Sequence, residues 1–205
     1  MSEDRPQLYL ATPPSFDLEV FPQLLARVLG AQEIACIRLG LATKDEDKVM
    51  RAADAVRQVA HEFDVALVIE NHIALVERHG LDGVHLTDGA RTVRYARKEL
   101  GQEAIVGCFC AASQHDGMTA GEAGADYVCF GPVGETGLGT GARAERDLFQ
   151  WWSEVIEVPV VAEGALTEDL VRDFAPVTDF FAVGEEIWTA EDPVAALGRL
   201  VAAMG

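Results

Sequence analysis

Short apolar runs alternate with helical segments along the whole of this 205-residue chain, and no other feature limits the fold as strongly. The runs are typical of parallel strands buried on both faces, and they lie within residues 7–11, 34–39, 65–69, 82–88, 104–110, 125–130, 158–162 and 177–183. The segments between them have helical spacing, as in residues 45–63, where apolar side chains recur at Val49, Ala52, Val56 and Val59. Eight such units in about 200 residues predict one α/β domain, a (β/α)8 TIM barrel over residues 1–205. An open, doubly wound parallel sheet is the alternative, because a number of strands does not by itself prove closure.

Charge and hydropathy exclude two classes of partner. The formal net charge is −18, and a surface this acidic repels nucleic acid and anionic membranes. No apolar run approaches the ~20 residues of a membrane helix, and residues 1–6 lack the basic and apolar regions of a signal peptide. We therefore expect a cytoplasmic protein that acts on neither nucleic acid nor membrane.

The cysteines and lysines argue against two kinds of chemistry. The cysteines fall inside or at the ends of predicted strands, which indicates reduced core thiols rather than disulfides or metal ligands: Cys36, Cys108, Cys110 and Cys129. A C-x-C pair without a second pair is a weak metal signal, so no metal site is predicted from them. A Schiff-base aldolase is not expected either, because no lysine lies at a predicted strand tip; the lysines are Lys44, Lys48 and Lys98.

Polar side chains at the carboxyl ends of the predicted strands are the candidates for function, because ligands bind there in parallel barrels. Arg38 is the arginine predicted at such a tip, and an unpaired buried guanidinium is costly. It should therefore pair with Glu70, Glu163 or an anionic ligand. Asn71 and His72 follow the third strand, where a polar pair is costly to keep without water or ligand.

Three histidines near strand tips are the candidates for acid–base catalysis: His72, His85 and His115. His85 lies between two apolar residues of the fourth strand, so a hydrogen-bonded structural role is the alternative for it. His115 precedes Asp116, and the alternative there is a solvated histidine beside a helix that Asp116 caps.

Several segments in register resemble the thiamine-phosphate synthase and TenI superfamily of small TIM barrels. They are Asn71, Asp82-Gly83-Val84-His85-Leu86, Gly124-Ala125-Asp126-Tyr127-Val128 and Gly131-Pro132, and the resemblance covers nearly the whole chain. It implies thiamine biosynthesis, in which the synthase joins a pyrimidine diphosphate to a thiazole phosphate with Mg²⁺ and releases pyrophosphate. The TenI branch tautomerises a thiazole instead.

The family's cation and metal motifs are only partly present. The family has the pattern Gln-x-Arg-x-Lys in its second strand, and the matching residues here are Cys36, Arg38 and Gly40. The lysine is therefore absent from its position, and Lys44, four residues further along, is the candidate replacement. Asn-Asp after the third strand reads Asn71-His72, and Gly-Gln-x-Asp after the fourth reads Thr87-Asp88-Gly89-Ala90. Mg²⁺ prefers several oxygen ligands in octahedral geometry, so a Mg²⁺ cofactor rests on the resemblance alone.

The phosphate motifs depart from the family in the same way. Phe109 stands at the position of the fifth strand's serine, and Thr136 is the threonine retained in the glycine-rich loop 131–141, a candidate lid. The turn after the seventh strand reads Glu163-Gly164-Ala165, and Glu185 replaces the serine after the eighth. Carboxylates at these turns oppose phosphate.

The resemblance therefore predicts a divergent thiamine-phosphate synthase or TenI-like protein that binds a thiamine precursor or related heterocycle. With the synthase motifs reduced, proton transfer on the heterocycle is the reaction expected if it is an enzyme, with His72, His85 and His115 as catalytic groups. The binding residues predicted are Arg38, Asn71, Asp88, Thr136, Glu163, Gly164 and Glu185. The alternative is a non-catalytic binding or regulatory barrel. A homodimer formed through the outer helices is compatible with the sequence, although no apolar stripe requires one.

Overall fold

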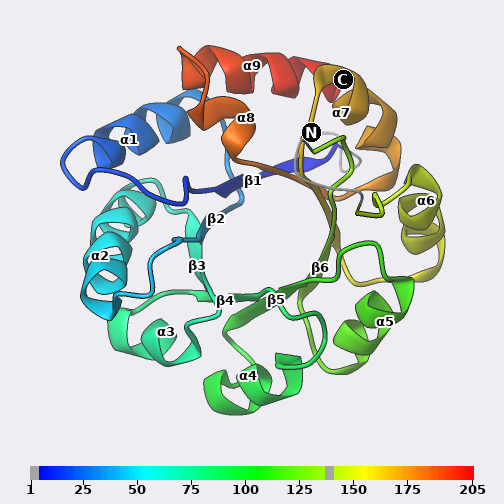
Figure 1. Ribbon diagram of the computed structural model, residues 1–205, viewed down its shortest axis with the longest axis horizontal. Helices are drawn as coiled ribbons and strands as arrows, with labels where there is room; N and C mark the ends of the chain where they lie inside the picture. Colours follow the sequence, from blue (N-terminus) through cyan, green and yellow to red (C-terminus); the bar gives the residue numbers. More distant parts are fainter. Residues whose placement is uncertain (1–4, 137–140) are drawn as a thin grey trace.

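The computed structural model describes residues 5–136 and 141–205. Its eight strands form one closed parallel barrel in the order β1 to β8, and helices surround the barrel (Figure 1). The strands are β1 (Gln7–Ala11), β2 (Cys36–Leu39), β3 (Ala66–Glu70), β4 (Gly83–Leu86), β5 (Ile105–Phe109), β6 (Tyr127–Phe130), β7 (Val160–Glu163) and β8 (Phe180–Val183). The predicted (β/α)8 barrel is confirmed, and the open sheet is wrong, because β1 pairs with both β2 and β8.

The helices follow the strands in alternation. They are α1 (Phe21–Ala31), α2 (Glu46–Glu62), α3 (Ile73–His79), α4 (Val93–Leu100), α5 (Gln114–Glu122), α6 (Arg146–Val155), α7 (Glu168–Phe174), α8 (Glu185–Trp188) and α9 (Pro193–Ala203), with a 3-10 turn at Ala175–Val177. In α2 the residues at helical spacing are buried, as the pattern predicts, because that face packs on the strands. Among the described residues, none of these helices is both long and apolar enough to cross a membrane.

One helix cap differs from the expectation. Ser113 caps α5 by accepting the backbone N–H of Asp116 at 3.1 Å, so the prediction that Asp116 is the cap is wrong. The serine lies three residues before the amide that it binds, which is the spacing an N-cap needs. The aspartate itself lies within the first helical turn.

Three aspartates close the amino end of the barrel in the same way. Each immediately precedes an even-numbered strand and accepts the backbone N–H of a residue in the preceding odd-numbered strand: Asp82 from Leu67 at 2.7 Å, Asp126 from Val106 at 2.7 Å and Asp179 from Val160 at 2.8 Å. A carboxylate that accepts a strand amide satisfies a donor that the neighbouring strand leaves free. Two of the segments that carry the family resemblance, around Asp82 and Asp126, therefore include fold-stabilising contacts at the end opposite the ligand side.

The core has two parts. A large apolar cluster lies between strands and helices, and a smaller cluster fills the barrel: Tyr9, Cys36, Val68, Tyr127, Cys129, Val161 and Ala182. All four cysteines are buried and free, which confirms the prediction of core thiols. Burial raises the pKa of the Cys36 thiol to about 12, so this thiol stays protonated and unreactive.

Candidate functional site

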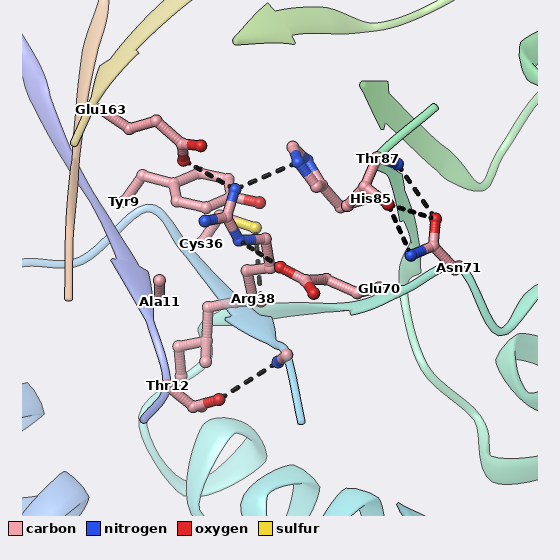
Figure 2. A network of polar contacts seen from close by, with 12 residues as sticks. Tyr9, Ala11, Thr12, Cys36, Arg38, Glu70, Asn71, His85, Thr87 and Glu163 are labelled. Atoms are coloured by element: carbon pink, nitrogen blue, oxygen red, sulfur yellow. Dashed lines mark hydrogen bonds and ion pairs between the residues drawn. The ribbon is translucent and has the colours of Figure 1, made fainter. Parts of the chain in front are cut away.

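Arg38, on β2, stands at the centre of a polar network inside the barrel mouth (Figure 2). Its Nη1 lies 2.8 Å from Oε2 of Glu163, and its Nε lies 3.2 Å from Oε1 of Glu70. Both ion pairs offered by the sequence as alternatives to an anionic ligand are formed. The Arg38 side chain is 12% exposed, and Arg38 Nε and Glu163 Oε2 lack hydrogen-bond alignment, so charge rather than directed hydrogen bonding holds this cluster.

A chain of hydrogen bonds continues from Arg38 through the barrel interior. Nη1 of Arg38 lies 3.1 Å from Nε2 of His85, Nδ1 of His85 lies 2.8 Å from the Tyr127 hydroxyl, and that hydroxyl lies 2.6 Å from the hydroxyl of Tyr9. A guanidinium can only donate. Nε2 of His85 is therefore the acceptor, and the ring proton sits on Nδ1 and is donated to Tyr127.

His85 is buried within this chain. Burial and then the positive charge of Arg38 lower the pKa of the His85 imidazole well below its usual value, so the ring is neutral at pH 7. Only 1% of the His85 surface is exposed, and Nε2 of its ring faces Arg38. The structure thus gives His85 the hydrogen-bonded position described above as the structural alternative.

The charges around Arg38 leave the site with more negative than positive charge. Burial opposes the charged form of Arg38, but Glu163 and then Tyr9, Cys129 and Glu70 outweigh it and raise the pKa of the guanidinium. Burial raises the pKa of the Glu70 carboxyl, Arg38 offsets part of this rise, and Glu163 adds to it. One cation faces two carboxyl groups, so an additional anion would meet repulsion rather than a free positive charge.

Gly40 makes room for the Glu70 carboxyl beside Arg38. A Cβ placed on Gly40 would lie 2.6 Å from Cδ of Glu70 and 2.7 Å from its Oε1. Gly40 stands at the position where the sequence resemblance expects a lysine. The Glu70 carboxyl therefore occupies space that any larger side chain at position 40 would need.

The polar side chains after β3 and β4 bind one another. The side-chain oxygen of Asn71 accepts the backbone N–H of Thr87 at 3.0 Å, and its nitrogen donates to the Thr87 hydroxyl at 2.8 Å. Asn71 has φ 60°, a left-handed conformation that asparagine tolerates better than most residues. The Thr92 hydroxyl donates to the carboxylate of Asp88.

This donor set does not fit Mg²⁺, the metal implied by the resemblance. The amide oxygen of Asn71 and the carboxylate of Asp88 are engaged by Thr87 and Thr92, and His72 supplies nitrogen where the cation prefers oxygen. Within residues 5–136 and 141–205, no three His, Cys, Asp or Glu residues are grouped to hold a metal ion.

His72 and His115 line two different cavities. A cavity of about 430 Å³ contains His72 together with Lys44, Glu70 and Asn71. A second cavity of about 400 Å³ contains His115 together with Asp88 and Asp116. A third cavity, of about 310 Å³, is lined by Arg38, Thr12 and Gly40 and shares Leu41, Ala42 and Glu70 with the first. Glu70 is therefore the charged member of the three residues that the two mouth cavities share.

The remaining predicted residues lie at the end of β7 or in the segments that follow β6, β7 and β8. Glu163 turns toward Arg38, and Gly164 and Ala165 follow it with φ 92° and 52°. Thr136 and Glu185 are exposed. The proposed lid includes residues 137–140, which lie outside the described residues.

Tyr9 and Tyr127 of the network, and Glu186 outside it, were not among the residues predicted from sequence. Tyr9 and Tyr127 occupy strand positions that are typical of packing, so only barrel closure shows that their hydroxyl groups meet. Glu70 was predicted as one of the alternative ion-pair partners of Arg38, and that ion pair is formed. Glu186 was missed in favour of its neighbour Glu185, although its carboxylate accepts backbone N–H groups of Leu166 and Gly184.

The free energy of unfolding should change with pH because the Glu70 carboxyl has a different pKa in the folded and unfolded protein. Its pKa is raised in the folded protein, so between the unfolded value, near 4.5, and the higher folded value the native state binds more protons. Stability contributed by protonated Glu70 is present below about pH 4.5 and is lost as the pH rises through the folded pKa. Urea unfolding from pH 4 to pH 7 should show the wild type losing stability relative to Glu70→Gln. If the wild type instead becomes more stable relative to Glu70→Gln between pH 4 and pH 7, the pKa of Glu70 is not raised in the folded protein.

The family model described as thiamine monophosphate synthase matches residues 8–187. A thiamine-phosphate synthase of Rhodospirillum centenum is 38% identical over 184 residues, covering 89% of this chain and 89% of that protein. Its counterpart in Hyphomonas neptunium is 38% identical over 205 residues, covering 95% and 91%. In structure, the chain is similar to a thiamine phosphate pyrophosphorylase from Pyrococcus furiosus, with TM-score 0.84, 20% identity and coverage of 98% and 96%. A 3-hexulose-6-phosphate synthase shares the fold, with TM-score 0.73, 17% identity and coverage of 97% and 100%.

Proposed function

The chain belongs to the thiamine monophosphate synthase family, and from that premise we propose that its barrel mouth binds a heterocycle related to the thiamine precursors and transfers protons on it. The observation that supports the proposal most directly is that Arg38 is already ion-paired within the chain. Its guanidinium is already paired with Glu70 and Glu163, so the charge that would otherwise attract a diphosphate is neutralised from within the chain.

The cavities around Glu70 supply the groups that proton transfer needs. Glu70 and His72 line the same cavity, and the raised pKa of the Glu70 carboxyl brings it closer to working pH than an exposed carboxylate. Histidine is the side chain that most often acts as a general acid or base in enzymes. We assign Glu70 and His72 the acid–base roles, and His85 positions Arg38 from inside the barrel. His115, with Asp116, lines the other cavity and is the acid–base candidate if the ligand lies there.

The complete synthase reaction is the second candidate. It is favoured by the 38% identity to proteins described as thiamine-phosphate synthases, which extends over most of both chains. This reaction would need Lys44 and Asp88 to replace the absent lysine and carboxylate. Lys44 does line the cavity of Glu70 and His72, whereas Asp88 lines the cavity of His115.

Ligand-dependent thermal unfolding separates the two candidates. The ligands are the thiazole alcohol, its phosphate, the pyrimidine alcohol and its diphosphate, each with and without Mg²⁺. A ligand at 100 times its dissociation constant stabilises the fold by about 2.7 kcal/mol, a shift of a few degrees. We expect shifts with the uncharged heterocycles that do not depend on Mg²⁺. A Mg²⁺-dependent shift with the diphosphate, together with release of pyrophosphate, would establish the synthase reaction instead.

Turnover of the ligand that binds tests the assigned residues. Proton exchange between that heterocycle and D₂O, followed by NMR, should fall at least about 100-fold in His72→Ala and in Glu70→Gln, since general acid–base catalysis contributes factors of this size. His61→Ala, an exposed histidine of α2, is the matched control and should keep the wild-type rate. Loss only in His115→Ala would move the site to the other cavity. Stabilisation without any turnover would identify a binding or regulatory barrel.

A further inference from the structure

The carboxylate of Glu186 lies between two backbone amides from different loops. Its Oε1 accepts the N–H of Leu166, after β7, at 3.0 Å. Its Oε2 accepts the N–H of Gly184, after β8, at 2.9 Å. Each carboxylate oxygen thus has its own donor, and the chain places a negative charge where two loops present N–H groups.

The backbone around these amides is fixed in position. Gly164 and Ala165 are both left-handed, with φ 92° and 52°, which alanine adopts at a cost. On the other side, Nε1 of Trp188 donates to the carbonyl oxygen of Ala11 at 2.7 Å, and the indole packs edge-on against Phe21 at 5.1 Å. These contacts hold α8 and the loop before it against β1.

Backbone amides in this part of a parallel barrel commonly bind anionic ligands. The loops after strands seven and eight frequently form the phosphate site of such barrels, because their N–H groups converge on the oxygens of an anion. In this protein the two amides already bind an anion, the Glu186 carboxylate. A phosphate group would have to displace that carboxylate and would also meet its charge.

We infer that Glu186 is a specificity-determining residue, a built-in anion that fills the phosphate cradle formed by the Leu166 and Gly184 amides. The site then admits ligands whose end near β7 and β8 is uncharged or cationic and rejects their phosphorylated forms. The chemical class of the ligand rests on the proposed function, but the occupation of the cradle does not. Glu70 and Glu163 add to this discrimination against phosphate, because they form ion pairs with Arg38 that an anionic ligand would otherwise form.

Glu185 provides the matched control for Glu186. The two residues are adjacent on α8 and carry the same charge, but Glu185 is exposed and its carboxylate has no described hydrogen-bond partner. Glu185→Ala and Glu186→Ala therefore change the net charge equally. A nonspecific effect of charge on phosphate binding would appear in both variants.

Inorganic phosphate is the probe, measured by isothermal titration and by thermal unfolding against chloride at equal ionic strength. We expect Glu186→Ala to bind phosphate at least about tenfold more tightly than the wild type and Glu185→Ala. Glu186→Gln, which keeps the size of the side chain, should show the same direction and serves if Glu186→Ala does not fold. Equal phosphate affinity in the wild type and the folded Glu186 variants would overturn the inference, as would an equal gain in Glu185→Ala.

The thiazole alcohol and its phosphate then distinguish this inference from the proposed function. If the inference holds, the Glu186 variants gain affinity for the phosphate ester relative to the alcohol. A second outcome is that neither thiazole binds any variant while inorganic phosphate binds only the Glu186 variants. In that case Glu186 does occupy the phosphate cradle, and the proposed ligand is wrong. If the wild type prefers the phosphate ester to the alcohol, Glu186 does not select against phosphate.

Discussion

Replacing Arg38 by methionine should lower the free energy of unfolding by about 3–5 kcal/mol at pH 7, the cost of removing one partner from a buried ion cluster. The variant leaves Glu70 and Glu163 without their shared cation and leaves Nε2 of His85 without its donor. Methionine keeps much of the apolar stem, so loss of charge pairing dominates over loss of packing. Urea unfolding monitored by circular dichroism gives the value.

The loss of unfolding free energy in Arg38→Met should become smaller as the pH falls. Protonation neutralises the Glu70 carboxyl, and its raised pKa makes it neutral at a higher pH than an exposed glutamate. Arg172→Met is the control, because Arg172 is 62% exposed and pairs with Asp169 at the surface. Such a pair contributes about 0–1 kcal/mol. Equal losses in the two variants would contradict the buried cluster.

Replacing Gly107 by alanine should destabilise the barrel by about 3 kcal/mol, the upper range for overpacking a core. A Cβ on Gly107 would lie 2.0 Å from Cζ of Tyr127 and 2.3 Å from its Cε1. The ring has little freedom to move, because its hydroxyl is hydrogen-bonded to both His85 and Tyr9. The added methyl group therefore breaks the interior network as well as the packing.

Gly198→Ala is the matched substitution on α9. A Cβ at that position meets no atom within 4 Å, and the helix interior favours alanine over glycine by about 0.5–1 kcal/mol. We expect a small rise in stability there, against the large loss at Gly107. A wild-type melting temperature for Gly107→Ala would show that the Tyr127 ring does not lie over β5.

The candidate site divides into residues that a strand position reveals and residues that only their contacts reveal. Arg38 and Glu163 were predicted because a charged residue at the end of a buried strand needs a partner, and the structure pairs them. Glu186 could not be told from Glu185 in the sequence. The two are adjacent on a one-turn helix, and only the position of the β7 loop decides which carboxylate meets the Leu166 amide.

The sequence by itself determined the strands, the helices and their alternation, because these depend on apolar spacing and caps within a few residues of one another. Thr167, for example, caps α7 by accepting the N–H of Leu170 within the same turn. The tertiary structure decided which distant polar groups meet. Tyr9 and Tyr127 are 118 positions apart, and Arg38 and His85 are 47 apart. Their contacts depend on the closure and register of the barrel, which bring β1, β2, β4 and β6 around one interior, and no local pattern encodes that geometry.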